Sequence, residues 1–288
     1  MTIDTVDSVR CENAARPAHD VARTWLLTPG RPDGNADFAR AERSAADVVV
    51  LDLEDGLPDA LKPEGRRAVR DWLGSHHAWV RVSPAATAEW SADLLALADA
   101  PGLRGVMLAK AETVTDVAAT AGRLGAGIPI VALIESAIGL ESALEIARHP
   151  ACVRLAFGLG DFRRDTGIAD DPVALAYPRT RLTVASRAAR LPGPIDGPTL
   201  RGAETRLRDD TETTQSTGMT GRLCLDPAHA GVINSLMSPS ADEIADARAT
   251  VHRLGGGGSV YDGSDLPALG RAQALLQRAE RLGLSAGA

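Results

Sequence analysis

Short runs rich in Val, Ile and Leu alternate along the chain with longer segments in which Ala, Leu, Arg and Glu follow a helical repeat. This alternation is typical of β/α units around a parallel sheet. The apolar runs predict eight strands, of which the seventh is short and weak: Thr24–Thr28, Asp47–Leu53, Ala78–Val82, Gly105–Ala109, Pro129–Ile134, Val153–Gly158, Pro194–Asp196 and Gly221–Asp226. The amphipathic segments predict helices, among them Asp37–Ser44, Pro63–Leu73, Ala88–Ala98, Thr113–Leu124, Leu140–His149 and Pro178–Ala189.

The number and order of these elements favour a (β/α)₈ TIM barrel. Eight strands with alternating helices in about 230 residues suit that fold better than an open doubly wound sheet. A dinucleotide-binding sheet of the open kind would also carry G-x-G-x-x-G after its first strand. The nearest segment here, FGLGDFRRDTG, follows the sixth strand and lacks that spacing.

The chain is predicted to have three parts. Residues 1–22 are polar and aperiodic, and we expect a flexible N-terminal arm there. Residues 23–254 would form the barrel, which is the catalytic domain. The glycine run at 255–258 is interpreted as a hinge, and the turn and helix after it, up to residue 288, as a C-terminal lid. Because that segment follows all eight β/α units, the barrel does not need it to close.

Composition narrows the classes of function. A hydrophobic content of 44% and a charged content of 24% are those of a globular protein. The net charge of -7 and the aromatic content of 3% argue against a nucleic-acid-binding surface. The sequence predicts no signal peptide and no membrane span, so we expect a cytoplasmic protein. Three widely spaced cysteines, Cys11, Cys152 and Cys224, are expected to be reduced thiols.

Charged residues gather at the predicted carboxyl ends of the strands, where a TIM barrel assembles its site. By itself each is compatible with an ordinary solvated loop residue, but their shared position favours one acidic site. In chain order they are Asp52, Glu54, Asp55, Arg81, Lys110, Glu112, Glu135, Asp161 and Asp226.

Glu135 and Asp161 are the candidate metal ligands. Glu135 ends the most apolar strand, and Asp161 follows the next strand, so the two carboxylates are expected to reach one ion. None of the six histidines is predicted to lie at a strand end, which argues against a zinc site and a serine triad. Carboxylates without histidine or thiolate select a hard cation, Mg²⁺ or Mn²⁺.

Arg81 is the second candidate, because an arginine within the strand AWVRV is costly to bury unless it meets an anion. Two interpretations stay open at this point. Arg81 either forms a salt bridge with Asp52 or Glu54 on the neighbouring strand, or it grips a substrate carboxylate or a developing enolate oxygen.

Several segments, taken in order, resemble the citrate lyase β-subunit-like branch of the HpcH/HpaI aldolase superfamily. The resemblance covers nearly the whole chain after the arm. The segments are WLLTPGRPDG, VVVLDLEDGLPDALKPEGR, WVRVS, VMLAKAE, ALIESAIGL, AFGLGDF, LCLDPAHAGVINSLMSPSADEIADAR and YDGSDLPALGRA.

The resemblance implies a Mg²⁺-dependent carbon-carbon lyase. It implies that Glu135 and Asp161 hold the metal, that Glu135 and Arg81 contact the substrate, and that coenzyme A is part of that substrate. The reaction would cleave or form a β-hydroxyacyl-CoA thioester, such as citramalyl-CoA or malyl-CoA, through a thioester enolate. Gly30 and Arg31, in the TPGRP turn, match a region that contacts the CoA phosphates.

The resemblance also implies a homo-oligomer, either a trimer or a hexamer built from trimers. Asp265 matches an acid-base aspartate that a neighbouring subunit's lid supplies. The chain departs from the family pattern in having Gly160 in place of a glutamate, Asp226 in place of a histidine, and a shorter segment before Asp265.

Three alternatives to a CoA ester lyase remain open on the same scaffold. The first is an aldolase that acts on a free 2-oxo acid, and the second is an acyl-CoA thioester hydrolase. The third is a non-catalytic subunit or binding protein.

Overall fold

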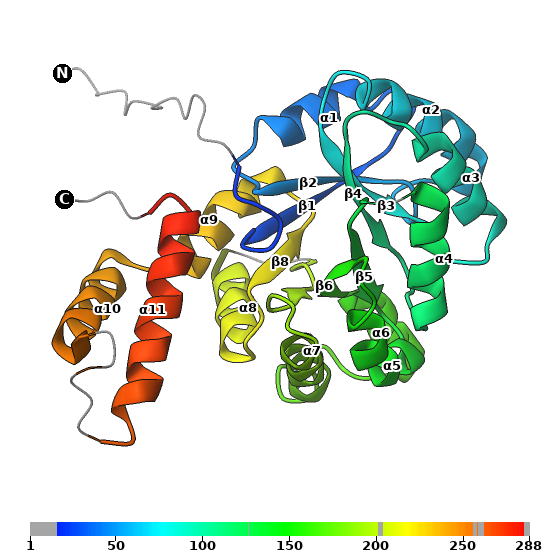
Figure 1. The fold of residues 1–288 in the computed structure, drawn as a ribbon. Coiled ribbons are helices and arrows are strands. Elements are labelled where there is room, and N and C mark those ends of the chain that lie inside the picture. Colours follow the sequence, from blue (N-terminus) through cyan, green and yellow to red (C-terminus); the bar gives the residue numbers. More distant parts are fainter. Residues whose placement is uncertain (1–15, 126, 201–203, 256–257, 259–261, 285–288) are drawn as a thin grey trace, which may run out of the picture.

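The computed structural model describes residues 16–125, 127–200, 204–255, 258 and 262–284. Within them, parallel strands pair in sequence order, and β8 closes on β1 (Figure 1). The predicted TIM barrel is therefore confirmed, and the closed sheet excludes the open doubly wound alternative. The strands are β1 (Thr24–Pro29), β2 (Val48–Asp52), β3 (Ala78–Val82), β4 (Leu103–Leu108), β5 (Ile130–Ile134), β6 (Cys152–Phe157), β7 (Ile195–Asp196) and β8 (Gly221–Cys224).

Helices surround the barrel, and the predicted ones are present with shifts of a few residues at their ends (Figure 1). Four of the described helices, α6, α8, α9 and α10, are not among the predicted segments, and α6 is a short helix that begins directly after β6. The helical elements are α1 (Asn35–Glu42), the 3₁₀ helix η1 (Asp59–Leu61), α2 (Lys62–Trp72), α3 (Ala88–Leu97), α4 (Val114–Leu124), α5 (Ala137–Ala147), α6 (Leu159–Thr166), α7 (Ala176–Ala188), α8 (Glu204–Ser216), α9 (Pro227–Met237), α10 (Ala241–Leu254) and α11 (Asp265–Arg281).

Two apolar layers form the core. Alternate strand residues point to opposite faces of a sheet, so each strand contributes to both layers. In β5, Val131 and Leu133 belong to the cluster inside the barrel, whereas Ile130, Ala132 and Ile134 pack in the cluster under the helices. The inward positions nearest the carboxyl ends of the strands face the barrel mouth.

A buried arginine closes the opposite end of the barrel. Arg154 in β6 is 0% exposed, and its guanidinium donates to the carbonyl oxygens of His19, Ala22 and Gly193 and to Oγ1 of Thr220 at 2.8–3.0 Å. Burial lowers the pKa of Arg154 to about 9. The side chain therefore joins the starts of β1, β7 and β8 by donating to backbone and hydroxyl oxygens.

We expect Arg154→Met to be strongly destabilising, because the substitution leaves buried carbonyl groups without donors. The expected loss in the free energy of unfolding is about 3 kcal/mol. Urea denaturation would measure it, with Arg67→Met as the control, since Arg67 is 66% exposed and pairs with Glu64 on the same helix. Equal losses in the two variants would show that Arg154 does not close the barrel.

The last two helices lie outside the ring. α10 and α11 pack against each other beside α9 (Figure 1). Toward the end of α11, Arg278 donates to the carbonyl of Met237, and Arg281 pairs with Asp20 near the start of β1. Gly255, at a φ of 54°, ends α10. Most of the predicted arm, and residues 256 and 257 of the predicted hinge, lie outside the described residues.

No helix in the described ranges is long and apolar enough to cross a membrane.

Candidate active site at the barrel mouth

Strand geometry places three charged side chains in the top inward layer of the barrel. Val50 in β2, Trp79 in β3 and Leu133 in β5 belong to the inner cluster. Two positions further along these strands stand Asp52, Arg81 and Glu135, which therefore face the mouth.

A cavity of about 410 Å³ opens at this end of the barrel. Arg81, Glu135 and Asp161 all line it, so the structure brings together the three residues on which the predicted site depends. Leucine and proline side chains form much of the rest of its wall. The lining residues are Leu27, Pro29, Asp52, Asp55, Gly56, Arg81, Leu133, Glu135, Gly158, Leu159, Gly160, Asp161, Pro198, Leu200, Leu223 and Leu225.

Arg81 is held by carboxylates from β2 and the loop after it. Asp52 and Arg81 are register partners, and Nε and Nη2 of Arg81 donate to the two oxygens of Asp52 at 2.7 and 2.6 Å. Nη1 lies 3.2 Å from Oε2 of Glu54. The salt bridge, one of the two interpretations left open by the sequence, is thus present with both carboxylates, and N–H donors remain on both Nη atoms. Burial opposes the charge, but Asp52 and Glu54 raise the pKa of Arg81, so it stays a cation.

Glu135 lies deep in the mouth. It is 5% exposed, and its Oε1 accepts a hydrogen bond from the backbone N–H of Lys110 at 2.8 Å. Its other oxygen packs on Gly158, where a Cβ atom would lie 2.2 Å from Oε2, so only glycine fits there. Burial raises the pKa of Glu135 to about 8, and the charge of Glu54 adds to the effect. The positive charge of Arg81 lowers this pKa but does not offset burial and the neighbouring carboxylates.

Asp161 enters the cavity from the first turn of α6. Its Oδ1 lies 3.1 Å from Nη2 of Arg164, and its Oδ2 lies 3.2 Å from Nζ of Lys110. Oδ2 is nevertheless a buried atom without a hydrogen bond of good geometry. The ion pair with Lys110 therefore lacks a directed N–H, which leaves lone pairs of Oδ2 free for another cation.

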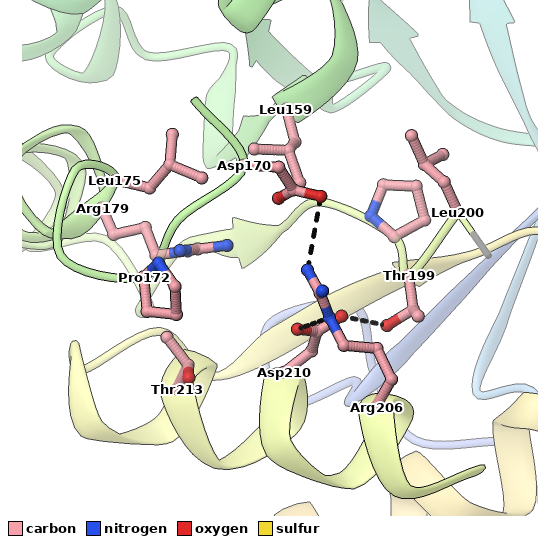
Figure 2. Close-up of a pocket in the computed structure, with 11 residues that line it drawn as sticks. Leu159, Asp170, Pro172, Leu175, Arg179, Thr199, Leu200, Arg206, Asp210 and Thr213 are labelled. Carbon is pink, nitrogen blue, oxygen red and sulfur yellow. Dashed lines mark hydrogen bonds and ion pairs between the residues drawn. The ribbon is translucent and has the colours of Figure 1, made fainter. Parts of the chain in front are cut away.

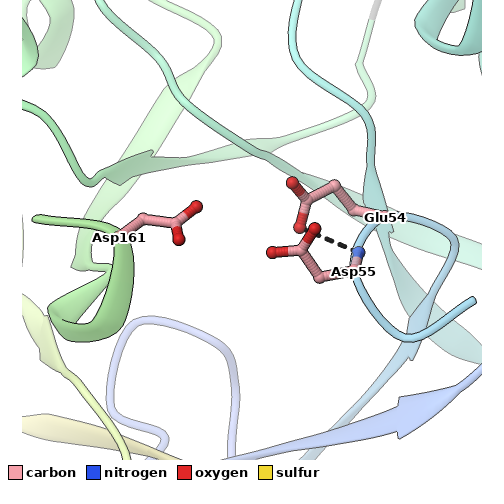
Figure 3. A group of neighbouring side chains, drawn as sticks. All are labelled: Glu54, Asp55 and Asp161. Atoms are coloured by element: carbon pink, nitrogen blue, oxygen red, sulfur yellow. Dashed lines mark hydrogen bonds between the residues drawn. The ribbon is translucent and has the colours of Figure 1, made fainter. Parts of the chain in front are cut away.

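Glu54, Asp55 and Asp161 form a group whose carboxylate oxygens lie within 4.8 Å of one another (Figure 3). Glu54 and Asp55 project from the loop after β2 and face Asp161 across the mouth. Glu135 shares the cavity but is not a member of this group. The sequence shows that Glu54 and Asp55 follow a strand end but not that they are candidate ligands, because their approach to Asp161 depends on the loop and on α6.

The donor set fits a hard divalent cation. It consists of carboxylate oxygens, and among the described residues no histidine or cysteine belongs to the group. Mg²⁺ usually takes one or two carboxylates and keeps water or substrate oxygens in its remaining positions. The buried, unbonded Oδ2 of Asp161 and the raised pKa of Glu135 both indicate a site with more negative charge than its protein cations balance.

The other predicted site residues lie elsewhere. Gly30 donates its N–H to the carbonyl of Asp52 at 2.9 Å, and Arg31 is exposed in the turn after β1. Asp265 begins α11, where its Oδ1 lies 3.5 Å from Nη1 of Arg253 in α10. Among the described residues, the cavity lining includes none of these three predicted residues.

Two of the strand-end charges have local structural partners instead. Oε1 of Glu112 accepts a hydrogen bond from Oγ of Ser136 at 2.6 Å. Asp226 caps the N-terminus of α9 by accepting from the N–H of Ala228 at 2.9 Å. A carboxylate at a strand end is therefore not by itself a sign of the active site.

A second cavity, of about 400 Å³, lies beside the mouth and shares Leu159, Pro198 and Leu200 with it. Figure 2 shows its charged residues turned toward one another: Arg206 joins Asp170 to Asp210, and Asp210 accepts from Thr199. These pairs balance the charges within the wall of the cavity, which supports a structural role for them.

The fold and the site define a class of barrel enzyme, and comparison with known proteins identifies it. The family model for HpcH/HpaI aldolase/citrate lyase matches residues 33–227, and that for the HpcH/HpaI aldolase C-terminal domain matches residues 242–283. The chain belongs to the HpcH/HpaI aldolase/citrate lyase family, as its motifs predict.

Two relatives are similar to this chain over most of their length. A citrate lyase subunit beta-like protein of Mycobacterium tuberculosis is 34% identical over 271 residues, which is 88% of this chain and 94% of that protein. A (3S)-malyl-CoA thioesterase of Cereibacter sphaeroides is 32% identical over 86% of this chain and 90% of its own.

A solved structure agrees with the fold. The protein CitE of Mycobacterium tuberculosis, in complex with magnesium, acetoacetate and coenzyme A, superposes with a TM-score of 0.72. It is 29% identical, and the match covers 90% of this chain and 98% of that one.

Proposed function

We propose that the protein is a Mg²⁺-dependent carbon-carbon lyase that cleaves or forms a β-hydroxyacyl-CoA thioester of the citramalyl-CoA or malyl-CoA type. The observation that carries the proposal is the meeting of Arg81, Glu135 and Asp161 in one cavity at the barrel mouth. The CitE structure with magnesium, acetoacetate and coenzyme A supports the choice of ligands. We infer a cytoplasmic enzyme, as the sequence predicts.

Glu135 and Asp161 would hold the metal, with Glu54 and Asp55 close enough to assist. When bound, Mg²⁺ would act as a Lewis acid on the oxygens of the 2-oxo acid half of the substrate. Mn²⁺ presents the same preference for oxygen and is expected to substitute.

Arg81 would stabilise the negative charge that develops on the departing thioester enolate. Its guanidinium stays charged, and its remaining Nη donors need no reorganisation because Asp52 fixes the plane of the group. The leucine wall of the cavity lowers the local dielectric and strengthens this interaction. The positions of Gly30 and Arg31 beside the mouth are consistent with the proposed contact to the CoA phosphates.

Analysis of the products tests the reaction type. With citramalyl-CoA or malyl-CoA and Mg²⁺, we expect acetyl-CoA together with pyruvate or glyoxylate, and no products after chelation. The thioesterase relative makes hydrolysis the second candidate, and its products would be free CoA and the hydroxy acid. Turnover of a free 2-oxo acid with an aldehyde, without CoA, would favour an aldolase. Absence of any turnover would favour a non-catalytic subunit or binding protein.

We further propose a homo-oligomer, a trimer or a hexamer of trimers, in which Asp265 serves a neighbour's site. The support is its position: Asp265 is 8% exposed and contacts Arg253 in its own chain, while α11 is joined at its far end to the opposite side of the barrel. Asp265 is thus held beside α10 and does not line the mouth cavity of its own chain.

Hybrid oligomers test this arrangement. Glu135→Gln and Asp265→Asn subunits are each expected to be inactive alone, and mixing them should restore part of the activity because a shared site can combine two intact halves. Activity would be measured after the subunits are mixed, dissociated and reassembled. Inactive hybrids would indicate that Asp265 acts within its own chain, and a fully active Asp265→Asn enzyme would remove it from the reaction.

A further inference from the structure

Lys110 follows β4 and places an ammonium group among the acids of the mouth. Its Nζ lies 3.2 Å from Oδ2 of Asp161 and 3.5 Å from Oε1 of Glu54. Both acids belong to the group whose oxygens lie within 4.8 Å of one another. A divalent cation held by Asp161 would therefore compete with the ammonium of Lys110 for that carboxylate and would repel the ammonium from Glu54 beside it.

The backbone does not explain why a long side chain stands at this position. Lys110 has a φ of 46°, in the left-handed region that glycine adopts more readily. The turn orients the N–H of Lys110 so that it donates to Oε1 of Glu135. Glycine would make the same hydrogen bond with less strain, so the reason for lysine lies in its ammonium group.

Lysine is also rare in this chain, whose basic residues are mostly arginines. Lys62 and Lys110 are its two lysines, although Lys and Arg together number 31. An arginine would bind two carboxylates through a rigid planar fork, whereas a lysine is a compact charge on a flexible stem. The side chain of Lys110 is 33% exposed, so it has a path toward solvent.

We propose that Lys110 is a resident counter-cation of the metal site. Its ammonium balances Glu54 and Asp161 when no divalent cation is bound, and it withdraws from them when one binds. Lys110 thus weakens metal binding and stabilises the metal-free protein. The inference rests on the proposed function in taking Asp161 as a metal ligand.

Calorimetric titration with Mg²⁺ alone tests the competition. Lys110→Met should bind Mg²⁺ roughly 10-fold more tightly than the wild type, because no internal charge has to be displaced or repelled. Lys62→Met is the matched control and should bind as the wild type does, since Lys62 pairs with Asp59 at 3.3 Å and does not line the cavity. Without Mg²⁺, Lys110→Met should melt at a lower temperature than the wild type, and Mg²⁺ should raise its Tm by more.

Lysine labelled with ¹³C at Cε gives an independent readout. The chain should show one resonance for each lysine, and Lys110→Met identifies the signal of Lys110 by its loss. Saturation with Mg²⁺ should shift the Lys110 resonance and leave that of Lys62 in place. A Lys110 resonance that stays in place at saturation would contradict the withdrawal.

A second variant covers the case in which Lys110→Met does not fold without metal. Lys110→Gly removes the same charge and relieves the left-handed backbone, so it should fold and should also bind Mg²⁺ more tightly. If the wild type and both variants show no saturable Mg²⁺ binding, the proposed function and this inference both fail. If the wild type binds Mg²⁺ and both variants bind it equally or more weakly, the counter-cation inference alone is overturned.

Discussion

Glu135→Gln and Asp161→Asn are each expected to abolish metal-dependent turnover while leaving the barrel folded. Each substitution removes a ligand charge and keeps the volume of the side chain. Glu135 is buried beside other carboxylates, so its neutral amide would cost the fold little, but an amide oxygen is a far weaker ligand for Mg²⁺ than a carboxylate. We expect a loss of about 10³-fold or more in activity, of the size seen when a central electrostatic group is removed.

Calorimetry with Mg²⁺ and circular dichroism would separate loss of metal from loss of fold. Asp226→Asn is the matched control, because Asp226 also follows a strand but caps α9, a task that asparagine performs equally well. Normal Mg²⁺ affinity in both Glu135→Gln and Asp161→Asn would show that the metal is placed wrongly.

Arg81→Lys should lower turnover by about 10²-fold or more, because a point charge on a flexible stem cannot reproduce a planar fork. The lysine could still meet Asp52 or Glu54, so the net charge of the mouth would be preserved. The expected loss therefore reflects the lost N–H donors and their orientation rather than the loss of a positive charge. Steady-state kinetics with saturating Mg²⁺ would measure it.

A structural role for Arg81 predicts a different pattern, in which Tm falls and kcat is retained. Arg66→Lys is the control for that pattern, since Arg66 binds Asp93 and Glu89 between α2 and α3 without lining the cavity. Near-normal kcat in Arg81→Lys would reduce Arg81 to a structural salt bridge.

Sequence periodicity was sufficient for the barrel because each strand is a short apolar run whose neighbours in sequence are also its neighbours in space. Even β7 was found, although it has 2 residues and pairs with β6 and β8 through few of them. The same periodicity explains why Arg81 and Glu135 face the mouth. They continue the inward positions of β3 and β5.

What the sequence could not specify was how the charges pair. The bidentate contact between Arg81 and Asp52 depends on the register of β2 with β3, which does not follow from either strand alone. The approach of Glu54 and Asp55 to Asp161 depends on the path of the loop after β2 and on the placement of α6, neither of which follows from the apolar pattern of the strands. The left-handed turn at Lys110 likewise follows from a contact with Glu135 across two strand ends.

The central claim is that Glu135 and Asp161 hold a catalytic divalent cation. A crystal structure with Mn²⁺, pyruvate and coenzyme A tests it most directly, because anomalous scattering locates the ion independently of the protein atoms. We predict one Mn²⁺ bound by carboxylate oxygens of both Glu135 and Asp161, with pyruvate oxygens completing its coordination. An ion held by Glu54, Asp55 and Asp161 without Glu135, or a mouth that binds pyruvate with no ion, would contradict the claim.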